Sequence, residues 1–237
     1  MIVKAIKTRI FREGEDLALF IGEHIRSLKN GSVVAITSKI VALAERRTAP
    51  VSKRASVVRS ESDALFKTKH VDLTLKDGMF MANAGVDDSN GNGKLILLPK
   101  DSFLAADLIR RELMKAFKVK KLGIVITDSR VAPLRAGVTG VAIGYAGFRG
   151  VMDYRGKKDI FGRRFKYTKV NVADGLAGAA TSLMGEGAEK KPLAIIEEAP
   201  VEFTEKINRK EILIPPDEDM YRPLFGRLLK KSSKRRK

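Results

Sequence analysis

Two adjacent aspartates, Asp87 and Asp88, stand in a loop of small residues that runs from Asn83 to Asn90. Apolar residues flank this loop on both sides, at 79–81 and 95–98. Because a buried unpaired charge is costly, the aspartates do not belong in a core. Magnesium and manganese prefer such hard oxygen ligands and usually share them with phosphates. The loop therefore suggests metal and nucleotide chemistry, and an Asx-rich turn between two strands is the alternative interpretation.

A second acidic motif, Asp128-Ser129-Arg130, follows the apolar run 121–127, which is the clearest buried strand of the chain. An acid at the end of a strand, followed by a hydroxyl, can place a metal ligand at the edge of a sheet. A helix cap or a turn would use the same residue types. Both interpretations stay open on this motif alone.

Two further segments have the character of anion-binding sites. Thr37-Ser38-Lys39 stands where a β-rich run changes into a small-residue helix, and a helix start presents backbone N–H groups to an anion. Residues 153–164 concentrate five cations and two acids around two glycines. Phosphate or carboxylate recognition needs such cations, although a solvated charged loop would have the same composition.

The helices and strands that must position these residues can be predicted from hydrophobic periodicity and from the residues typical of helix ends. We expect helices over 15–28, 102–117 and 173–184, a strand leading into a helix over 32–44, and strands over 94–99 and 192–196. Residues 46–62 are polar and basic with little periodicity, which predicts a loop or hairpin. Residues 137–150 hold five glycines without a dinucleotide fingerprint, which favours a bulged or closely packed strand. His24 lies on the apolar face of the first helix and is expected to be a packing residue rather than a zinc ligand.

Composition limits the class of protein. The chain has 237 residues, of which 44% are hydrophobic, and no cysteine, so it can form a full core but no disulfide or thiolate site. No apolar run approaches the roughly 20 residues of a membrane span, and the start of the chain lacks a signal-peptide core, so we expect a cytoplasmic protein. The net charge is +18, and residues 227–237 carry seven cations and no acid. We expect 232–237 to be disordered, as a solubilising tail or a weak nucleic-acid contact.

Taken in order, six motifs resemble the coenzyme F420-0:L-glutamate ligase family: ANAGVDDSN, ITDS, GVAIGYAG, DYRGKKDIFGRR, VADGLAGAA and MGEG. The resemblance covers residues 1–198, and 199–237 would be a C-terminal extension with the basic tail. It implies an α+β fold with two interlocked lobes of sheet packed by helices, in an intertwined homodimer. It also implies GTP-dependent addition of L-glutamate to a deazaflavin coenzyme precursor, or a related carboxylate, through an acyl phosphate.

The family's functional residues transfer onto the matching positions of this chain. The resemblance implies two Mg²⁺ or Mn²⁺ ions per site, with K⁺ as a further candidate, and its metal ligands would be Asp87, Asp128, Ser129 and Glu186. Its nucleotide contacts would be Thr8, Arg9, Ile10, Phe11, Ser38, Lys39, Asn90, Met184, Gly185 and Gly187. Candidates for binding substrate or phosphate are Arg135, Arg155, Lys157 and Arg163.

The sequence departs from the family pattern at several of these places. Leu43 stands where the family usually has a lysine, and Ser129 where it usually has a threonine. The phrase DSRVAPLR replaces the usual DTFGRPWR, and Arg135 is what survives of that group. Leu43 and the basic tail motivate a second hypothesis, a ligase-like protein that binds nucleotide or nucleic acid without ligase activity.

Overall fold

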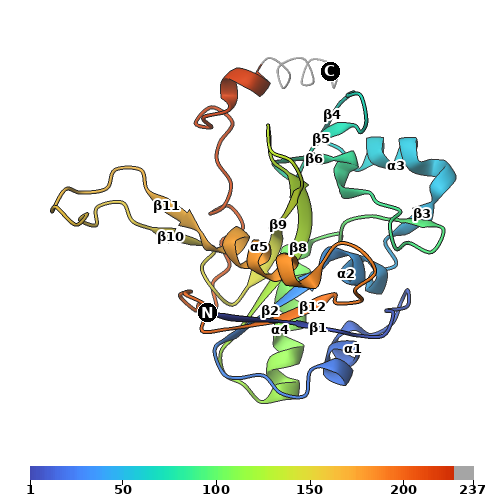
Figure 1. Ribbon diagram of the computed structural model, residues 1–237, viewed down its shortest axis with the longest axis horizontal. Coiled ribbons are helices and arrows are strands. Elements are labelled where there is room, and N and C mark those ends of the chain that lie inside the picture. Colours follow the sequence, from blue (N-terminus) through green and yellow to red (C-terminus); the bar gives the residue numbers. More distant parts are fainter. Residues whose placement is uncertain (227–237) are drawn as a thin grey trace. The chain divides into compact units, whose positions relative to one another are not determined.

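The computed structural model describes residues 1–226, which form two compact units (Figure 1). Unit 1 comprises Met1–Arg46 and Pro99–Arg209, and unit 2 comprises Arg47–Leu98 and the described residues from Lys210 onward. The expected disorder of 232–237 concerns residues outside this range. The predicted α+β class is confirmed, since both units combine sheets with helices. No helix of the described part is long and apolar enough to cross a membrane.

Unit 1 is built on a five-stranded sheet in which β2 and β8 are parallel and the other neighbours are antiparallel. In spatial order its strands are β1 (Ile2–Ile6), β12 (Leu193–Glu197), β2 (Ser32–Thr37), β8 (Leu122–Val131) and β9 (Val138–Ala146). The side chains of β2 and of the first six residues of β8 are almost all buried, which matches their continuous apolar sequence. This parallel pair forms the centre of the core.

Helices cover both faces of this sheet, α5 on one face and α4 with α1 on the other (Figure 1). Their bounds are α1 (Leu17–His24), α2 (Ser38–Ala44), α4 (Ser102–Phe117) and α5 (Val172–Met184). Asp101 caps α4 by accepting a hydrogen bond from the Leu104 N–H at 2.9 Å, as the sequence predicted. Helix α1 is shorter than predicted, because the backbone becomes extended at Ile25.

The glycine-rich segment forms a bulged strand, one of the two alternatives that its sequence predicted. In the pairing of β9 with β8, Gly144 lies opposite Ile126 and Ala142 lies opposite Thr127, so Ile143 is the extra residue. The bulge reverses which face the neighbouring residues present. Gly140 therefore faces α5, whereas Gly144 faces the start of α4.

A long hairpin arm, residues 151–171, leaves the sheet of unit 1 after β9 (Figure 1). Its base is the antiparallel pair β10 (Val151–Asp153) and β11 (Lys169–Asn171). The backbone N–H of Val172 donates to the Gly150 carbonyl at 2.8 Å, which ties the arm to the start of α5.

Unit 2 contains two small antiparallel sheets. The first pairs β3 (Thr48–Pro50) with β7 (Lys94–Ile96), and the second contains β4 (Ala64–Phe66), β5 (Leu73–Lys76) and β6 (Met79–Ala82). Its helical segments are η1 (Val51–Lys53), α3 (Arg54–Ser60) and η2 (Asn83–Gly85). The prediction of a loop or hairpin over 46–62 was therefore wrong. Helix α3 has only seven residues, too few for a clear period, and it is held by the packing of Val58 against Val86, Leu95 and Leu97.

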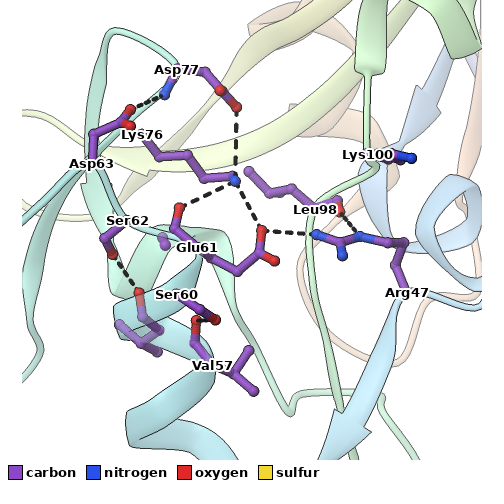
Figure 2. A network of polar contacts seen from close by, with 12 residues as sticks. Arg47, Val57, Ser60, Glu61, Ser62, Asp63, Lys76, Asp77, Leu98 and Lys100 are labelled. Carbon is purple, nitrogen blue, oxygen red and sulfur yellow. Dashed lines mark hydrogen bonds and ion pairs between the residues drawn. The ribbon is translucent and has the colours of Figure 1, made fainter.

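A partly buried carboxylate, Glu61, joins the elements of unit 2 (Figure 2). It accepts hydrogen bonds from Arg47 Nη2 at 2.8 Å and from Lys76 Nζ at 2.9 Å. Arg47 also donates from Nε to the Leu98 carbonyl at 3.1 Å. Burial alone would raise the pKa of Glu61, but the hydrogen bonds from Lys76 and Arg47 outweigh it and the pKa is lowered.

Candidate functional site

The carboxyl ends of the parallel strands β2 and β8 bring together Ser38 and Asp128. Thr37 and Thr127 are paired across the two strands, so the next residue of each strand lies at the same edge of the sheet. Ser38 is the first residue of α2, and its hydroxyl donates to Asp128 Oδ1 at 3.1 Å. Ligands of open α/β sheets bind outside the carboxyl ends of parallel strands, which makes this edge the candidate site.

Asp128 is a carboxylate that is surrounded mostly by protein and keeps part of its side chain accessible. Desolvation raises its pKa, and the Ser38 hydroxyl, the Ser129 N–H and the positive charges of Lys39 and Arg130 oppose that rise. The net shift is upward, so the ionised form is disfavoured in this environment. A bound cation would offset this cost, since an opposite charge at contact distance favours the carboxylate.

Ser129 meets Glu186 on the other face of the sheet. Its hydroxyl donates to Glu186 Oε1 at 2.6 Å. Glu186 follows the end of α5, where Gly185 adopts a φ of +82°. The family resemblance implied that Ser129 and Glu186 are both metal ligands, and the structure places these two side chains in contact.

Gly140 is the residue that lets α5 deliver Glu186 to this position. It lies opposite Ser129 in the pairing of β9 with β8. A Cβ atom on Gly140 would lie 2.1 Å from Thr181 Oγ1 and 2.7 Å from the Ala177 carbonyl oxygen. Since neither atom could stay in place at such distances, only glycine allows α5 to pack this closely against β9.

The oxygen atoms of Asp128, Ser129 and Glu186 fit the ligand preference of Mg²⁺ and Mn²⁺. Within either unit, the described residues form no group of three acidic, histidine or cysteine side chains close enough to hold an ion. The fourth predicted ligand, Asp87, belongs to unit 2. Unit 1 therefore supplies one part of the predicted donor set.

Asp87 adopts the Asx turn that was the alternative interpretation of its loop. Its carboxylate accepts from the Ser89 N–H at 2.9 Å and from the Ser89 hydroxyl at 2.5 Å. Its backbone pairs with Ile96, which fixes the loop against β7. Asp88 forms an ion pair with Arg54 at 2.6 Å, and Asn90 has a φ of +56°. A turn and a metal ligand are compatible roles for Asp87, because the turn fixes the direction of its carboxylate.

The two stretches that were predicted to contact the nucleotide are adjacent in unit 1. The Thr8 N–H donates to the Lys190 carbonyl at 2.8 Å, which joins segment 8–11 to the loop that follows α5 and contains Gly185 and Gly187. The Thr37 N–H donates to the Pro192 carbonyl at 3.0 Å, so the second stretch also reaches the edge that carries Ser38. Sequence reasoning missed Glu189, whose carboxylate accepts from the Gly187 N–H at 2.8 Å and fixes this loop.

Arg9 faces α1 rather than the strand ends. Its guanidinium forms ion pairs with Glu15 at 2.8 Å and Glu23 at 3.0 Å and lies over the Phe20 ring. The hydrogen bond from Arg9 lowers the pKa of Glu15. Because the Arg9 side chain is engaged with α1, the predicted nucleotide contact of segment 8–11 would be made by its backbone.

His24 holds the same segment from α1. Its Nδ1 lies 2.8 Å from the Phe20 carbonyl oxygen, and its Nε2 lies 3.2 Å from the Arg9 backbone nitrogen. Because a carbonyl only accepts and an amide N–H only donates, these partners assign a neutral ring with the proton on Nδ1. The ring also packs on Phe20, with centroids 4.5 Å apart, so His24 has the packing role that the sequence predicted.

The predicted substrate-binding cations lie on exposed connections. Arg135 follows β8 in the link to β9, and Arg155, Lys157 and Arg163 belong to the hairpin arm. Arg155 forms an ion pair with Asp153 at 2.6 Å, and its hydrogen bonds lower the pKa of Asp153 to about 2. Lys157 Nζ lies 4.7 Å from the centroid of the Tyr154 ring. The arm thus has its own internal contacts.

Comparison with known proteins places these features in a family. The family model of F420-0:Gamma-glutamyl ligase matches residues 5–198. The coenzyme F420:L-glutamate ligase of Methanococcus maripaludis strain S2 is 40% identical over 168 residues, which are 70% of this chain and 67% of that protein. The protein of the same name from Methanocaldococcus jannaschii is 36% identical over 210 residues, 86% of this chain and 84% of that protein.

A third relative, the coenzyme F420:L-glutamate ligase of Methanococcus maripaludis strain C6, is 43% identical over 147 residues. That match covers 62% of this chain and 58% of the relative, so the chain spans less than two thirds of that protein's length. The family match includes Ser38, Asp128 and Ser129 at the strand ends and Glu186 after α5. The chain belongs to the F420-0:gamma-glutamyl ligase family.

Proposed function

We propose that this protein is a ligase that joins L-glutamate to coenzyme F420-0, or to a related carboxylate, at the expense of GTP. The observation that carries the proposal is the pairing of Ser38 with Asp128 and of Ser129 with Glu186 at the end of β8. Relatives over most of the chain are named coenzyme F420:L-glutamate ligases, which supports the choice of reaction.

The proposed chemistry has two displacements. A carboxylate oxygen of the acceptor attacks the γ-phosphorus of GTP, and GDP leaves with the electrons of the broken P–O bond. The amine of glutamate then attacks the acyl carbon, phosphate leaves, the amine loses a proton, and an amide remains. The task of the protein in such transfers is to position the reactants and to stabilise the developing charge.

Asp128, Ser129 and Glu186 of unit 1 would hold divalent cations, Mg²⁺ or Mn²⁺, and K⁺ is a further candidate. Asp87 would be a further metal ligand, as the family resemblance implies. Bound ions would neutralise phosphate charge, and that is their contribution to the chemistry. The nucleotide would be contacted by residues that surround this same edge of the sheet, namely segment 8–11, Ser38, Lys39 and the loop 184–187. Asn90 of unit 2 would be a further nucleotide contact.

A homodimer in the cytoplasm is part of the proposal. The hairpin arm exposes large apolar side chains, with Ile160 92%, Phe161 84% and Tyr167 88% accessible. Exposed apolar groups of this size on one projection are typical of an interaction site. Light scattering of the purified chain tests this point, and a monomer at micromolar concentration contradicts it.

The decisive experiment measures hydrolysis of GTP that depends on both glutamate and the deazaflavin acceptor, with mass spectrometry of the amide product. Asp128→Ala and Asp87→Ala are expected to lose the reaction. Asp88→Ala is the matched control, because Asp88 is engaged with Arg54 on the protein surface. Full activity of Asp128→Ala, or absence of product with the wild-type chain, contradicts the proposal.

A second candidate is a nucleotide- or nucleic-acid-binding protein that keeps the fold without the reaction. Leu43 lies in the last turn of α2, which carries no cation, and its carbonyl accepts from the Gly14 N–H at 2.9 Å. GTP binding without amide product would favour this candidate. Nucleic acid bound through the basic tail would show a steep loss of affinity with salt and would be lost on removal of residues 227–237.

A further inference from the structure

Arg130 is a cation at the candidate site to which the sequence gave no role. It follows Ser129 directly and stands two residues after Asp128 on β8, so Asp128 and Arg130 leave the strand on the same side. The buried stretch of β8 ends at Thr127, and the side chains of 128–130 are partly exposed. The charge of Arg130 is close enough to Asp128 and Asp174 to interact with both carboxylates, at the edge of the sheet that carries the candidate site.

The Arg130 guanidinium is a partly buried positive charge. Desolvation lowers the pKa of Arg130, and the charges of Asp174 and Asp128 act against that change. Both carboxylates are fixed by other groups. Asp174 accepts from the Ala142 N–H at 2.8 Å and from Asn171 Nδ2 at 2.7 Å, and Asp128 accepts from the Ser38 hydroxyl at 3.1 Å.

A cation bound by Asp128 would change this balance of charge. It would take up the negative charge of Asp128, and it would repel the guanidinium, since both groups are partly buried and screening by water is reduced. An oxyanion that contacts both positive charges removes this conflict. The planar guanidinium presents donors in a fork that matches two oxygens of a carboxylate or a phosphoryl group, which a lysine does not.

We infer that Arg130 binds an oxyanion of the substrates beside Asp128, either a phosphoryl group of the nucleotide or the carboxylate of the amino acid. This assignment rests on the proposed function and deepens it. It differs from a purely structural role, in which Arg130 only neutralises Asp128 and Asp174. A structural arginine would affect stability and leave ligand affinity unchanged.

Isothermal titration of the full chain tests the assignment, with GTP in the presence of Mn²⁺ in one arm and L-glutamate alone in the other. Arg130→Met is expected to weaken one of the two ligands by about tenfold or more, and Arg130→Lys by less, because it keeps the charge but loses the fork. The arm that changes identifies the oxyanion. Arg111→Met is the matched control, since Arg111 is exposed on α4 and pairs with Asp107 at 2.6 Å.

Thermal denaturation of each variant establishes that it folds. If Arg130→Met does not fold, the affinities of Arg130→Lys alone test the assignment. Wild-type affinity of the folded Arg130 variants in both arms would overturn the assignment and leave the proposed function standing. A wild-type chain that binds neither GTP nor glutamate would overturn both. Weakened binding in the Arg130 variants together with normal binding in Arg111→Met supports the assignment even if no amide product is found.

Discussion

The Ser38 hydroxyl donates to Asp128 Oδ1 at 3.1 Å, across two parallel strands that are 90 residues apart in sequence. This hydrogen bond is one of the contributions that oppose the effect of burial on Asp128. It therefore favours the ionised carboxylate that a metal requires. It is the structural basis of the first two predictions.

Ser38→Ala is expected to weaken Mn²⁺ binding roughly tenfold, the usual scale for loss of a group that orients a metal ligand. Without the hydroxyl, the pKa of Asp128 rises further and protons compete better with the ion. Titration of Mn²⁺ into the chain measures the effect. Ser182→Ala is the control, because that hydroxyl donates to the Gly178 carbonyl on the exposed side of α5. Equal affinities of the two variants would contradict the role of Ser38.

Asp128→Asn is expected to abolish metal binding and to raise the melting temperature of the metal-free protein at neutral pH. The pKa of Asp128 is raised in the folded state, so its contribution to stability is fully present below the unfolded pKa and is lost as pH rises through the folded pKa. At neutral pH the wild type carries the cost of an ionised, desolvated carboxylate, and asparagine does not. Calorimetry from pH 4 to pH 8 should show the gain of the variant growing with pH. A gain that is independent of pH would contradict this account.

Glu61→Gln is expected to destabilise the fold by about 2 kcal/mol at neutral pH, since two charge-assisted hydrogen bonds are weakened and Arg47 and Lys76 lose the carboxylate that they share. The pKa of Glu61 is lowered, so its contribution is present above the unfolded pKa and is lost as pH falls through the folded pKa. The difference between wild type and variant should therefore shrink in acid. Chemical denaturation at several pH values measures it, with exposed Glu218→Gln as the control.

Gly140→Ala is expected to cost about 1–3 kcal/mol of stability, because the new Cβ would overlap Thr181 and the Ala177 carbonyl. It should also weaken metal binding, since a shift of α5 separates Glu186 from Ser129. Gly175→Ala is the matched control on α5, where a Cβ meets nothing within 4 Å. That change should stabilise the helix by up to about 1 kcal/mol. If both substitutions were neutral, close packing of α5 on β9 would not position Glu186.

Much of the fold could be predicted from local patterns. The buried run before Asp128, the capped helix after Asp101 and the bulged glycine strand all carry signals within a few residues. Helix α3 could not be predicted, because seven residues are too few for a clear period and its stability comes from Val58 packing against residues 28 to 39 positions away. The pairing of Thr8 with Lys190 had no local signal either.

The sequence by itself indicated which residues could bind metal and nucleotide. Asp128 and Ser129 follow a buried apolar run, Glu186 follows a small-residue helix, and the order of the motifs matches a known family. Tertiary structure decided which of them meet. The register of β2 against β8 joins Ser38 to Asp128, and the absence of a side chain at Gly140 brings α5 close enough for Glu186 to reach Ser129. Hydrophobic periodicity indicates, over a few residues, which face of a helix or strand is buried. The distances between helices and strands depend instead on the packing of the whole core.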